Sequence, residues 1–267
     1  MIQVGFIGAG KMAEAMMAGF IKERVVAPVE ILAGDVSAER LAEVSRKHGV
    51  RITLDNAEVV RETSVCVLAV KPQQLNEILR NLAPHFTSDH LIISIAAGKT
   101  TGYLESLLPN GRLVRVMPNI ACLVGEGMNV YARGARATAA DSEQVARLLG
   151  CCGKATELPE TLFDAVTALS GSGPAFFAYL LDRLVDGAVQ EGMPRGQALM
   201  LASQTMLGTA RLLMEKGMEP AGLAEAVTSA KGTTAAGRAV LETPELAELL
   251  SRTIAAAARR SRELAGA

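Results

Sequence analysis

The amino-acid sequence predicts an α/β protein in two parts, a doubly wound parallel sheet over residues 1–157 and a set of helices over residues 158–267. In the first part, short apolar runs alternate with amphipathic stretches, which is typical of strands buried by helices on both faces. From Pro159 onward, long Ala-, Leu- and Met-rich stretches are broken by Gly and Pro, and none of them reads as a strand.

The strands of the first part are predicted from continuous runs of Val, Ile and Leu. These runs cover residues 2–7, 29–33, 65–70, 91–95 and 113–117. The amphipathic stretches at residues 37–48 and 73–82 predict helices between them. Apolar strands that alternate with helices form a parallel sheet with helices on both faces, which is the doubly wound arrangement.

The second part is predicted to contain a helix over residues 160–191, bent at Gly173 and Pro174, and another over 195–216. The bend is read either as a packing kink or as a turn that exposes polar backbone. Shorter helices begin near Pro220 and Gly232, and a last one begins at Pro244. The helix over 195–216 is apolar on too many faces to be solvated. We therefore expect an obligate oligomer that forms through this part.

The composition excludes several classes of protein. The 27 basic and 28 acidic residues nearly balance, aromatic residues make up 3% and Trp is absent, so a nucleic-acid partner is not expected. No apolar stretch is long enough to span a bilayer, and the first residues lack the features of a signal peptide, so a cytoplasmic location is expected. The four Cys and three His lack metal-ligand spacing, so no metal is expected, and the cysteines read as small buried hydrophobes.

A glycine-rich segment, Gly8-Ala9-Gly10-Lys11-Met12-Ala13, follows the first strand and opens a helix that ends near Phe20. It has the pattern G-x-G-x-x-A of a Rossmann-like dinucleotide site. Gly8 permits the tight turn, Gly10 leaves room for a pyrophosphate, and Ala13 lets the helix pack close to the strand. The amides at the helix N-terminus can bind the phosphates, so this segment predicts a dinucleotide cofactor.

The second strand ends at Gly34-Asp35, about twenty residues after the glycines, where an acidic residue can bind a ribose 2′-hydroxyl. A carboxylate there repels a 2′-phosphate and favours NADH. Arg40 could still turn toward the site to hold a phosphate, and Asp35 could also be the N-cap of the helix that begins near Ser37.

Several segments together resemble the pyrroline-5-carboxylate reductase family over essentially the whole chain. They are the glycine-rich segment and Ala69-Val70-Lys71-Pro72-Gln73, with Ser94-Ile95-Ala96-Ala97-Gly98 and Arg115-Val116-Met117-Pro118-Asn119, then Ser170-Gly171-Ser172-Gly173-Pro174-Ala175 and Thr228-Ser229-Ala230-Lys231-Gly232-Thr233-Thr234. The resemblance implies a dinucleotide domain followed by an all-α dimerisation domain, with dimers often assembled into decamers. It also implies reduction of 1-pyrroline-5-carboxylate to L-proline by NAD(P)H, the last step of proline biosynthesis, with NADPH as the family's usual cofactor.

The resemblance also implies the site residues. The cofactor would contact Ile7, Gly8, Ala9, Gly10, Lys11, Met12, Ala13, Asn56, Leu68, Ala69, Val70, Lys71, Pro72 and Ala97, beside Gly34 and Asp35. The substrate would contact Glu160, Ser229, Gly232, Thr233 and Thr234. Some of these residues could have a structural role without any ligand. Lys71 could be a solvated residue before a proline turn, and Glu160 could be an acidic residue in the first turn of a helix. The Ser and Thr residues could form an ordinary helix N-cap.

A cyclic imine fits a site without a strong acid. The helical part contains no His, and the segment after Ser172 lacks the Lys that β-hydroxyacid dehydrogenases place in a similar helix. An imine nitrogen can enter protonated, so the enzyme mainly has to orient the reactants, with Thr234 hydrogen-bonded to the ring nitrogen and loop amides holding the carboxylate.

The chain departs from the family pattern in places. It has Ala230-Lys231 where the family has Pro-Gly, Ile120-Ala121 where it has Thr-Pro, and Ala226 in place of an Asn. The alternatives are therefore a reductase of another cyclic imine, a β-hydroxyacid dehydrogenase, or a non-catalytic nucleotide-binding regulator whose Lys231 fills the substrate pocket.

Overall fold

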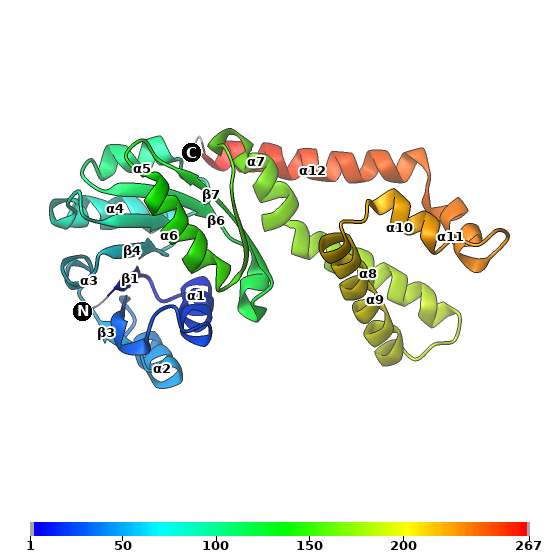
Figure 1. Ribbon diagram of the computed structural model, residues 1–267, viewed down its shortest axis with the longest axis horizontal. Coiled ribbons are helices and arrows are strands. Elements are labelled where there is room, and N and C mark those ends of the chain that lie inside the picture. Colours follow the sequence, from blue (N-terminus) through cyan, green and yellow to red (C-terminus); the bar gives the residue numbers. More distant parts are fainter. Residues whose placement is uncertain (1–2, 266–267) are drawn as a thin grey trace. The chain divides into compact units, whose positions relative to one another are not determined.

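The computed structural model describes residues 3–265, so Ile2, at the start of the first predicted strand, lies outside the described residues. Contacts divide the chain into two compact units (Figure 1). The first comprises residues 3–172 together with 257–265, and the second comprises residues 173–256. This division falls later than residue 157, because the segment that follows Glu157 packs on the sheet through buried Phe163 and the ion pair of Glu160 with Arg115.

The first unit contains an eight-stranded sheet in the order β3-β2-β1-β4-β5-β6-β7-β8. All neighbouring strands pair in parallel except β6 and β7, which are antiparallel. The predicted doubly wound sheet is thus confirmed, with one antiparallel pair that the sequence analysis did not anticipate. The strands are β1 (Val4–Ile7), β2 (Ile31–Gly34), β3 (Arg51–Thr53), β4 (Val65–Leu68), β5 (Leu91–Ser94), β6 (Arg112–Met117), β7 (Gly127–Arg133) and β8 (Gly153–Glu157).

Helices cover both faces of this sheet. Residues of α1 (Lys11–Lys22), α2 (Ala38–His48) and α6 (Ala139–Gly150) share one buried apolar cluster with the sheet. Residues of α3 (Asn56–Glu62), α4 (Pro72–Leu82) and α5 (Thr101–Leu107) share the other. Phe6 and Ile7 in β1 face opposite clusters, as the two-residue period of a strand requires.

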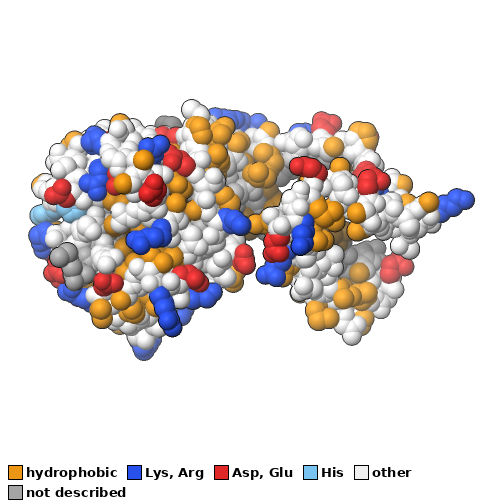
Figure 2. All heavy atoms as spheres, in the orientation of Figure 1, with side chains coloured by type: hydrophobic (Ala, Val, Ile, Leu, Met, Phe, Trp, Pro, Cys, Tyr) orange, Lys and Arg blue, Asp and Glu red, His pale blue; other side chains and the backbone are white. Residues whose placement is uncertain are grey.

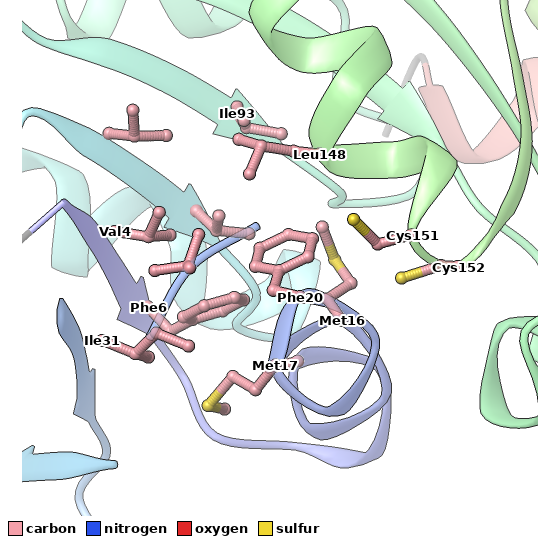
Figure 3. Packing of buried hydrophobic residues seen from close by; sticks show 14 of the residues in the cluster. Val4, Phe6, Met16, Met17, Phe20, Ile31, Ile93, Leu148, Cys151 and Cys152 are labelled. Carbon is pink, nitrogen blue, oxygen red and sulfur yellow. The ribbon is translucent and has the colours of Figure 1, made fainter. Parts of the chain in front are cut away.

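The cluster under α1 is the larger one and is drawn in Figure 3. The rings of Phe6 and Phe20 lie 6.0 Å apart, and Met16 packs beside them (Figure 3). All four cysteines are buried with free thiols, which confirms their interpretation as small buried hydrophobes. Burial raises the pKa of the Cys66 and Cys152 thiols to about 12.

Helices follow for the rest of the described chain. They are α7 (Phe163–Val166), a π-helical turn (Thr167–Gly171), α8 (Gly173–Gln190), α9 (Arg195–Lys216), α10 (Pro220–Ala226), α11 (Thr233–Leu241) and α12 (Pro244–Ala265). No strand occurs in the described residues after Glu157, as predicted. The predicted bend before Pro174 takes the form of the π-helical turn, in which the Ser172 N–H donates to the Thr167 carbonyl at 2.8 Å.

The second unit exposes a large apolar surface on α8 and α9. The two helices are tied at one end by Arg195 of α9, which pairs with Asp182 and Asp186 of α8. Beyond these pairs they form a groove lined almost entirely by apolar side chains, including Phe177, Leu184, Leu201, Met206 and Leu213. Hydrophobic side chains gather at the surface of this unit (Figure 2), as the sequence of the α9 segment predicts. Among the described helices, none is sufficiently long and apolar to cross a membrane.

Replacing Phe20 by Ala tests the core under α1. The side chain is fully buried, so Phe20→Ala should lower the free energy of unfolding by about 3–5 kcal/mol. Urea unfolding at fixed protein concentration, followed by circular dichroism, measures this change. The matched control is Val29→Ala at a side chain that is 68% exposed, which should change it by less than about 0.5 kcal/mol. Equal effects of the two variants would contradict the described core.

Candidate functional site

The glycine-rich turn between β1 and α1 has the geometry of a phosphate site. Gly8 has φ +99°, and a Cβ there would lie 2.8 Å from the Ala69 carbonyl oxygen at the end of β4. Gly10 is the N-cap of α1 and its surroundings are open, with nothing within 4 Å of an added Cβ. Among residues 3–265, no side chain caps α1, so its first amides remain available to an anion.

The peptide groups on either side of Ala9 are held by the segment that follows β2. The Ala9 N–H donates to Asp35 Oδ2 at 2.8 Å, and the Ala9 carbonyl accepts from Arg40 Nε at 2.7 Å. Asp35 Oδ1 also accepts from the Ser37 N–H at 3.0 Å. Ser37, and not Asp35, is the N-cap of α2, since its side chain accepts from the Arg40 N–H at 3.2 Å. The alternative interpretation of Asp35 as a helix cap is therefore wrong.

Asn56 provides an unpaired polar atom beside this turn. Among the described residues, its Oδ1 is a buried side-chain oxygen without a hydrogen-bond partner. A Cβ on Gly34 would lie 2.6 Å from this oxygen, so a glycine is needed where β2 ends. Asn56 lines a pocket together with Gly8, Gly10 and Asp35. A pocket-lining residue with an unpaired acceptor fits a ligand that carries hydroxyl donors, such as the ribose of a dinucleotide.

A second pocket continues from the first and shares four of its lining residues. Gly10, Ala69, Val70 and Lys71 line both pockets, and the second also includes Pro118 after β6. Lys71 is extended (φ −62°, ψ 141°) and precedes Pro72, which begins α4. The cleft therefore follows the carboxyl ends of neighbouring strands, where open α/β sheets bind their ligands.

The structure brings most of the predicted cofactor residues to this cleft. The pockets are lined by Gly8, Gly10, Lys11, Met12, Asp35, Asn56, Ala69, Val70, Lys71, Pro72 and Ala97. Others lie behind the cleft with less than 2% of their surface exposed, namely Ile7, Ala9, Ala13 and Leu68. These residues shape the floor of the cleft. Lining residues that the sequence analysis missed are Val36, Gln74, Ile78, Ile95, Ala96, Met117 and Pro118. Gln74 follows one turn after Lys71, a spacing that could have indicated it.

The predicted substrate loop lies in the second unit, between α10 and α11. Its Gly232 is the N-cap of α11, and no side chain in the described part of the chain caps the helix. The Gly232 N–H donates to the Ser229 carbonyl at 3.0 Å, and a Cβ on Gly232 would lie 2.2 Å from Ser229 Oγ. The interpretation of the Ser/Thr residues as an ordinary N-cap is therefore wrong. The amides that begin α11, at Thr233 and Thr234, are free to bind an anion.

Arg238 of α11 braces this loop. Its Nη1 donates to Thr228 Oγ1 at 3.0 Å and to Glu225 at 2.9 Å, and its Nε donates to Glu242 at 2.7 Å. Lys231 has φ +59°, a left-handed conformation that favours glycine, which explains why the family pattern has glycine there. The Lys231 side chain is exposed.

Glu160 lies in the first unit and is engaged by its own surroundings. Its Oε1 accepts from the Thr101 N–H and from Arg115 Nη1, both at 2.8 Å, and its Oε2 accepts from the Thr101 hydroxyl. Arg115 is buried and stacks over the Phe163 ring at 4.6 Å. Burial opposes ionisation of Glu160, but the bonds from Arg115 and Thr101 outweigh it and lower the pKa of this carboxyl. A substrate contact of Glu160 stays a prediction.

Comparison with known proteins agrees with this geometry. Residues 3–98 match the family described as NADP oxidoreductase, coenzyme F420-dependent. Residues 160–264 match the family described as pyrroline-5-carboxylate reductase dimerisation. The matched segment begins three residues after the predicted domain boundary at residue 157. Together with the cleft, these matches define a nicotinamide-dinucleotide-dependent oxidoreductase, and the prediction of an NAD(P)H cofactor is confirmed.

Curated proteins match this chain over nearly its whole length. It is 46% identical to the pyrroline-5-carboxylate reductase of Methanosarcina acetivorans, over 98% of this chain and 97% of that protein. It is 40% identical to the Arabidopsis thaliana enzyme of that name, over 98% and 95%. The chain belongs to the pyrroline-5-carboxylate reductase family.

Solved structures of family members share the fold. The Coxiella burnetii pyrroline-5-carboxylate reductase superposes with a TM-score of 0.94 at 32% identity, over 98% of both chains. The Plasmodium falciparum pyrroline carboxylate reductase, solved with NADP bound, superposes with a TM-score of 0.87 at 28% identity, over 99% of this chain and 98% of that one.

Replacing Gly8 by Ala tests the phosphate turn. Because φ is +99° and the added Cβ would meet the Ala69 carbonyl, Gly8→Ala should weaken NAD(P)H binding at least about tenfold. Titration followed by nicotinamide fluorescence measures the dissociation constant. Gly102→Ala in α5, where an added Cβ meets nothing, is the control and should leave binding as it is. Normal binding by Gly8→Ala would exclude this turn as the cofactor site.

Proposed function

We propose that this protein reduces 1-pyrroline-5-carboxylate to L-proline by hydride transfer from NAD(P)H, the last step of proline biosynthesis. The observation that carries the proposal is the match over nearly the full length of both chains to relatives with this name, at 46% and 40% identity. A dinucleotide cleft and an uncapped helix N-terminus beside Ser/Thr side chains supply the two binding functions that such a reaction needs.

On the cofactor side, each residue of the cleft has a definite task. The amides at the start of α1 hold the pyrophosphate, and the Asp35 carboxylate and Asn56 amide hold the adenosine ribose. The turn from Ala69 to Pro72, with Ala97 beside it, receives the nicotinamide end. When bound, NAD(P)H supplies the hydride, and the protein's contribution is to orient it.

On the substrate side, the loop before α11 binds the imine. The amides of Thr233 and Thr234 bind the carboxylate at the positive end of the helix dipole, and Ser229 assists them. The Thr234 hydroxyl accepts a hydrogen bond from the protonated ring nitrogen. Hydride addition to the iminium carbon converts the C=N double bond to a single bond and leaves its electron pair on nitrogen. The resulting amine takes a proton from water, so the site needs no strong acid.

Oxidation of NADH and of NADPH in the presence of pyrroline-5-carboxylate tests this function, and we expect turnover. Thr234→Val should lower kcat at least about tenfold, and Thr234→Ser should restore most of it, because one hydrogen bond to a charged group is lost and regained. Thr253→Val in α12, where the hydroxyl bonds only its own helix, is the matched control and should retain wild-type turnover.

The other outcomes separate the alternatives. Wild-type turnover by Thr234→Val would remove the role assigned to that residue. Turnover only with a different cyclic imine would indicate another reductase. Cofactor binding without reduction of any imine would favour a regulator, and in that case Lys231→Gly should open the substrate loop to the carboxylate.

We also propose that the protein is a cytoplasmic homodimer formed by the groove of α8 and α9. The dimerisation family matched over residues 160–264 supports association through this part, and the groove is lined by apolar side chains. Burying such a surface against a second copy stabilises both chains by roughly 25 cal/mol for each Å² removed from water. Assembly of these dimers into a decamer is the larger state expected for the family.

Leu201→Glu tests the interface. Leu201 lines the groove and is 51% exposed, so a carboxylate there would have to be buried unpaired in the dimer. We expect the variant to lose its association, measured as molar mass by light scattering after size exclusion. Glu215→Gln on the same helix is the control and should keep the wild-type mass. A monomeric wild type, or an unchanged mass for Leu201→Glu, would contradict the interface.

A further inference from the structure

An ion-pair cluster lies directly beneath the predicted phosphate turn. Glu14 of α1 contacts three basic side chains of α2: Arg40, Lys47 at 2.6 Å and His48 at 3.2 Å. Only 13% of the Glu14 side chain is exposed. The hydrogen bond from Lys47, together with those from Arg40 and His48, outweighs the effect of burial and lowers the pKa of Glu14 to about 2. The carboxylate is therefore ionised whenever the protein is folded near neutral pH.

This cluster determines where the Arg40 guanidinium lies. Nε donates to the Ala9 carbonyl at 2.7 Å, Nη1 donates to Glu43 at 2.7 Å, and Nη2 pairs with Glu14. Every nitrogen of the guanidinium thus has a partner. The possibility that Arg40 turns toward the cofactor to hold a phosphate would require these bonds to break.

The carboxylate of Asp35 is left without a cation. It accepts from the N–H groups of Ala9 and Ser37, and within residues 3–265 it takes part in no ion pair. It lines the same pocket as Asn56, whose buried Oδ1 is unpaired among the described residues. The pocket therefore presents a carboxylate that is not neutralised by an ion pair, and the other charged residue in its lining, Lys71, follows β4 and not β2. Acceptors bind hydroxyl groups, and a fixed carboxylate repels a phosphate.

We propose that Asp35 and Glu14 together make this protein select NADH over NADPH, with Asp35 as the specificity-determining residue and Glu14 as a positioning residue. Asp35 accepts the ribose 2′-hydroxyl and repels a 2′-phosphate, and Glu14 keeps Arg40 and Lys47 away from the place where that phosphate would lie. The proposal rests on the proposed function only for the use of a nicotinamide cofactor.

Equilibrium binding to the full-length protein tests the proposal without any turnover. The dissociation constants of NADH and NADPH are measured by nicotinamide fluorescence at one fixed salt concentration, since screening weakens phosphate repulsion. We expect NADH to bind at least about tenfold more tightly. Tighter binding of NADPH by the wild type would overturn the proposal.

Variants of Asp35 and of Glu14 separate the contributions of these two residues to cofactor selection. Asp35→Ser should lose NADH affinity and gain NADPH affinity, moving their ratio by about a hundredfold, which corresponds to one charged hydrogen bond lost and one repulsion removed. Asp35→Asn, which preserves the shape of the side chain, should move the ratio in the same direction and serves where the serine variant unfolds. An unchanged ratio in both variants would remove Asp35 from the selection.

Glu14→Gln should release Arg40 and Lys47 and raise NADPH affinity relative to NADH by roughly three- to tenfold. Glu23→Gln at the exposed end of α1 is the matched control and should leave the ratio unchanged. Arg40→Met removes the donor to the Ala9 carbonyl, so it should weaken the binding of both cofactors, but it should leave their ratio unchanged because Arg40 does not serve the phosphate in the wild type. A selective loss of NADPH affinity in Arg40→Met, or no change in Glu14→Gln, would overturn the role of Glu14.

The same samples distinguish failure of this inference from failure of the proposed function. Reduction of pyrroline-5-carboxylate with a preference for NADPH would retain the function and reject the selection of NADH. Tighter NADH binding without reduction of the imine would retain the selection and reject the function.

Discussion

The cofactor cleft depends on one short stretch of backbone, the two peptide groups that flank Ala9. The Ala9 N–H is held by Asp35 and its carbonyl by Arg40, so the glycine-rich turn is bonded on both sides to the segment after β2. Gly8 closes the same turn against the end of β4. Three strands that are distant in sequence thereby fix the position of the α1 N-terminus. A site that binds phosphates through backbone amides needs this rigidity, because an amide cannot adjust its direction as a side chain can.

The packing beneath the turn supports this arrangement. The two buried clusters on opposite faces of the sheet hold α1 and α3 in place, and both helices begin at the cleft. Phe20 and Met16 keep α1 against β1, while Val59 of α3 packs near Gly34. The buried side chains of these helices and strands therefore fix the two ends of the loops that carry the polar atoms of the site.

Much of the fold could be predicted from the sequence where apolar runs were continuous, as in β1, β4 and β5. The strands that were missed have a polar or exposed character. β3 is three residues long and largely exposed, and β7 contains Asn129, which is fully buried because its amide bonds the Leu149 and Lys154 carbonyls. An Asn in the sequence favours a loop, because the carbonyl groups that satisfy its buried amide are not apparent from the sequence. The close contact between Gly127 and Gly153, where a Cβ would meet backbone at 2.1 Å, has no signature in a single sequence either.

The site could be predicted only in part, because some of its contacts join segments that are distant in the sequence. The spacing of Gly8, Gly10 and Asp35 is local and follows from known chemistry, so it indicated the cofactor. The fixed position of Arg40 depends on Glu14, 26 residues earlier in the chain, and that pairing exists only once α1 and α2 have packed. The engagement of Glu160 by Thr101 and Arg115 is of the same kind, since three separate segments contribute to it.

The buried cysteines have a practical consequence. A thiol with a pKa of about 12, as for Cys66 and Cys152, is a thiolate in roughly one molecule in 100,000 at neutral pH. Burial also raises the pKa of the Cys122 and Cys151 thiols, so alkylating reagents and mild oxidants meet few thiolates in the native protein. All four cysteines belong to the sheet-containing unit. The rate at which they become alkylated reports how often that unit opens, independently of any opening in the helical unit.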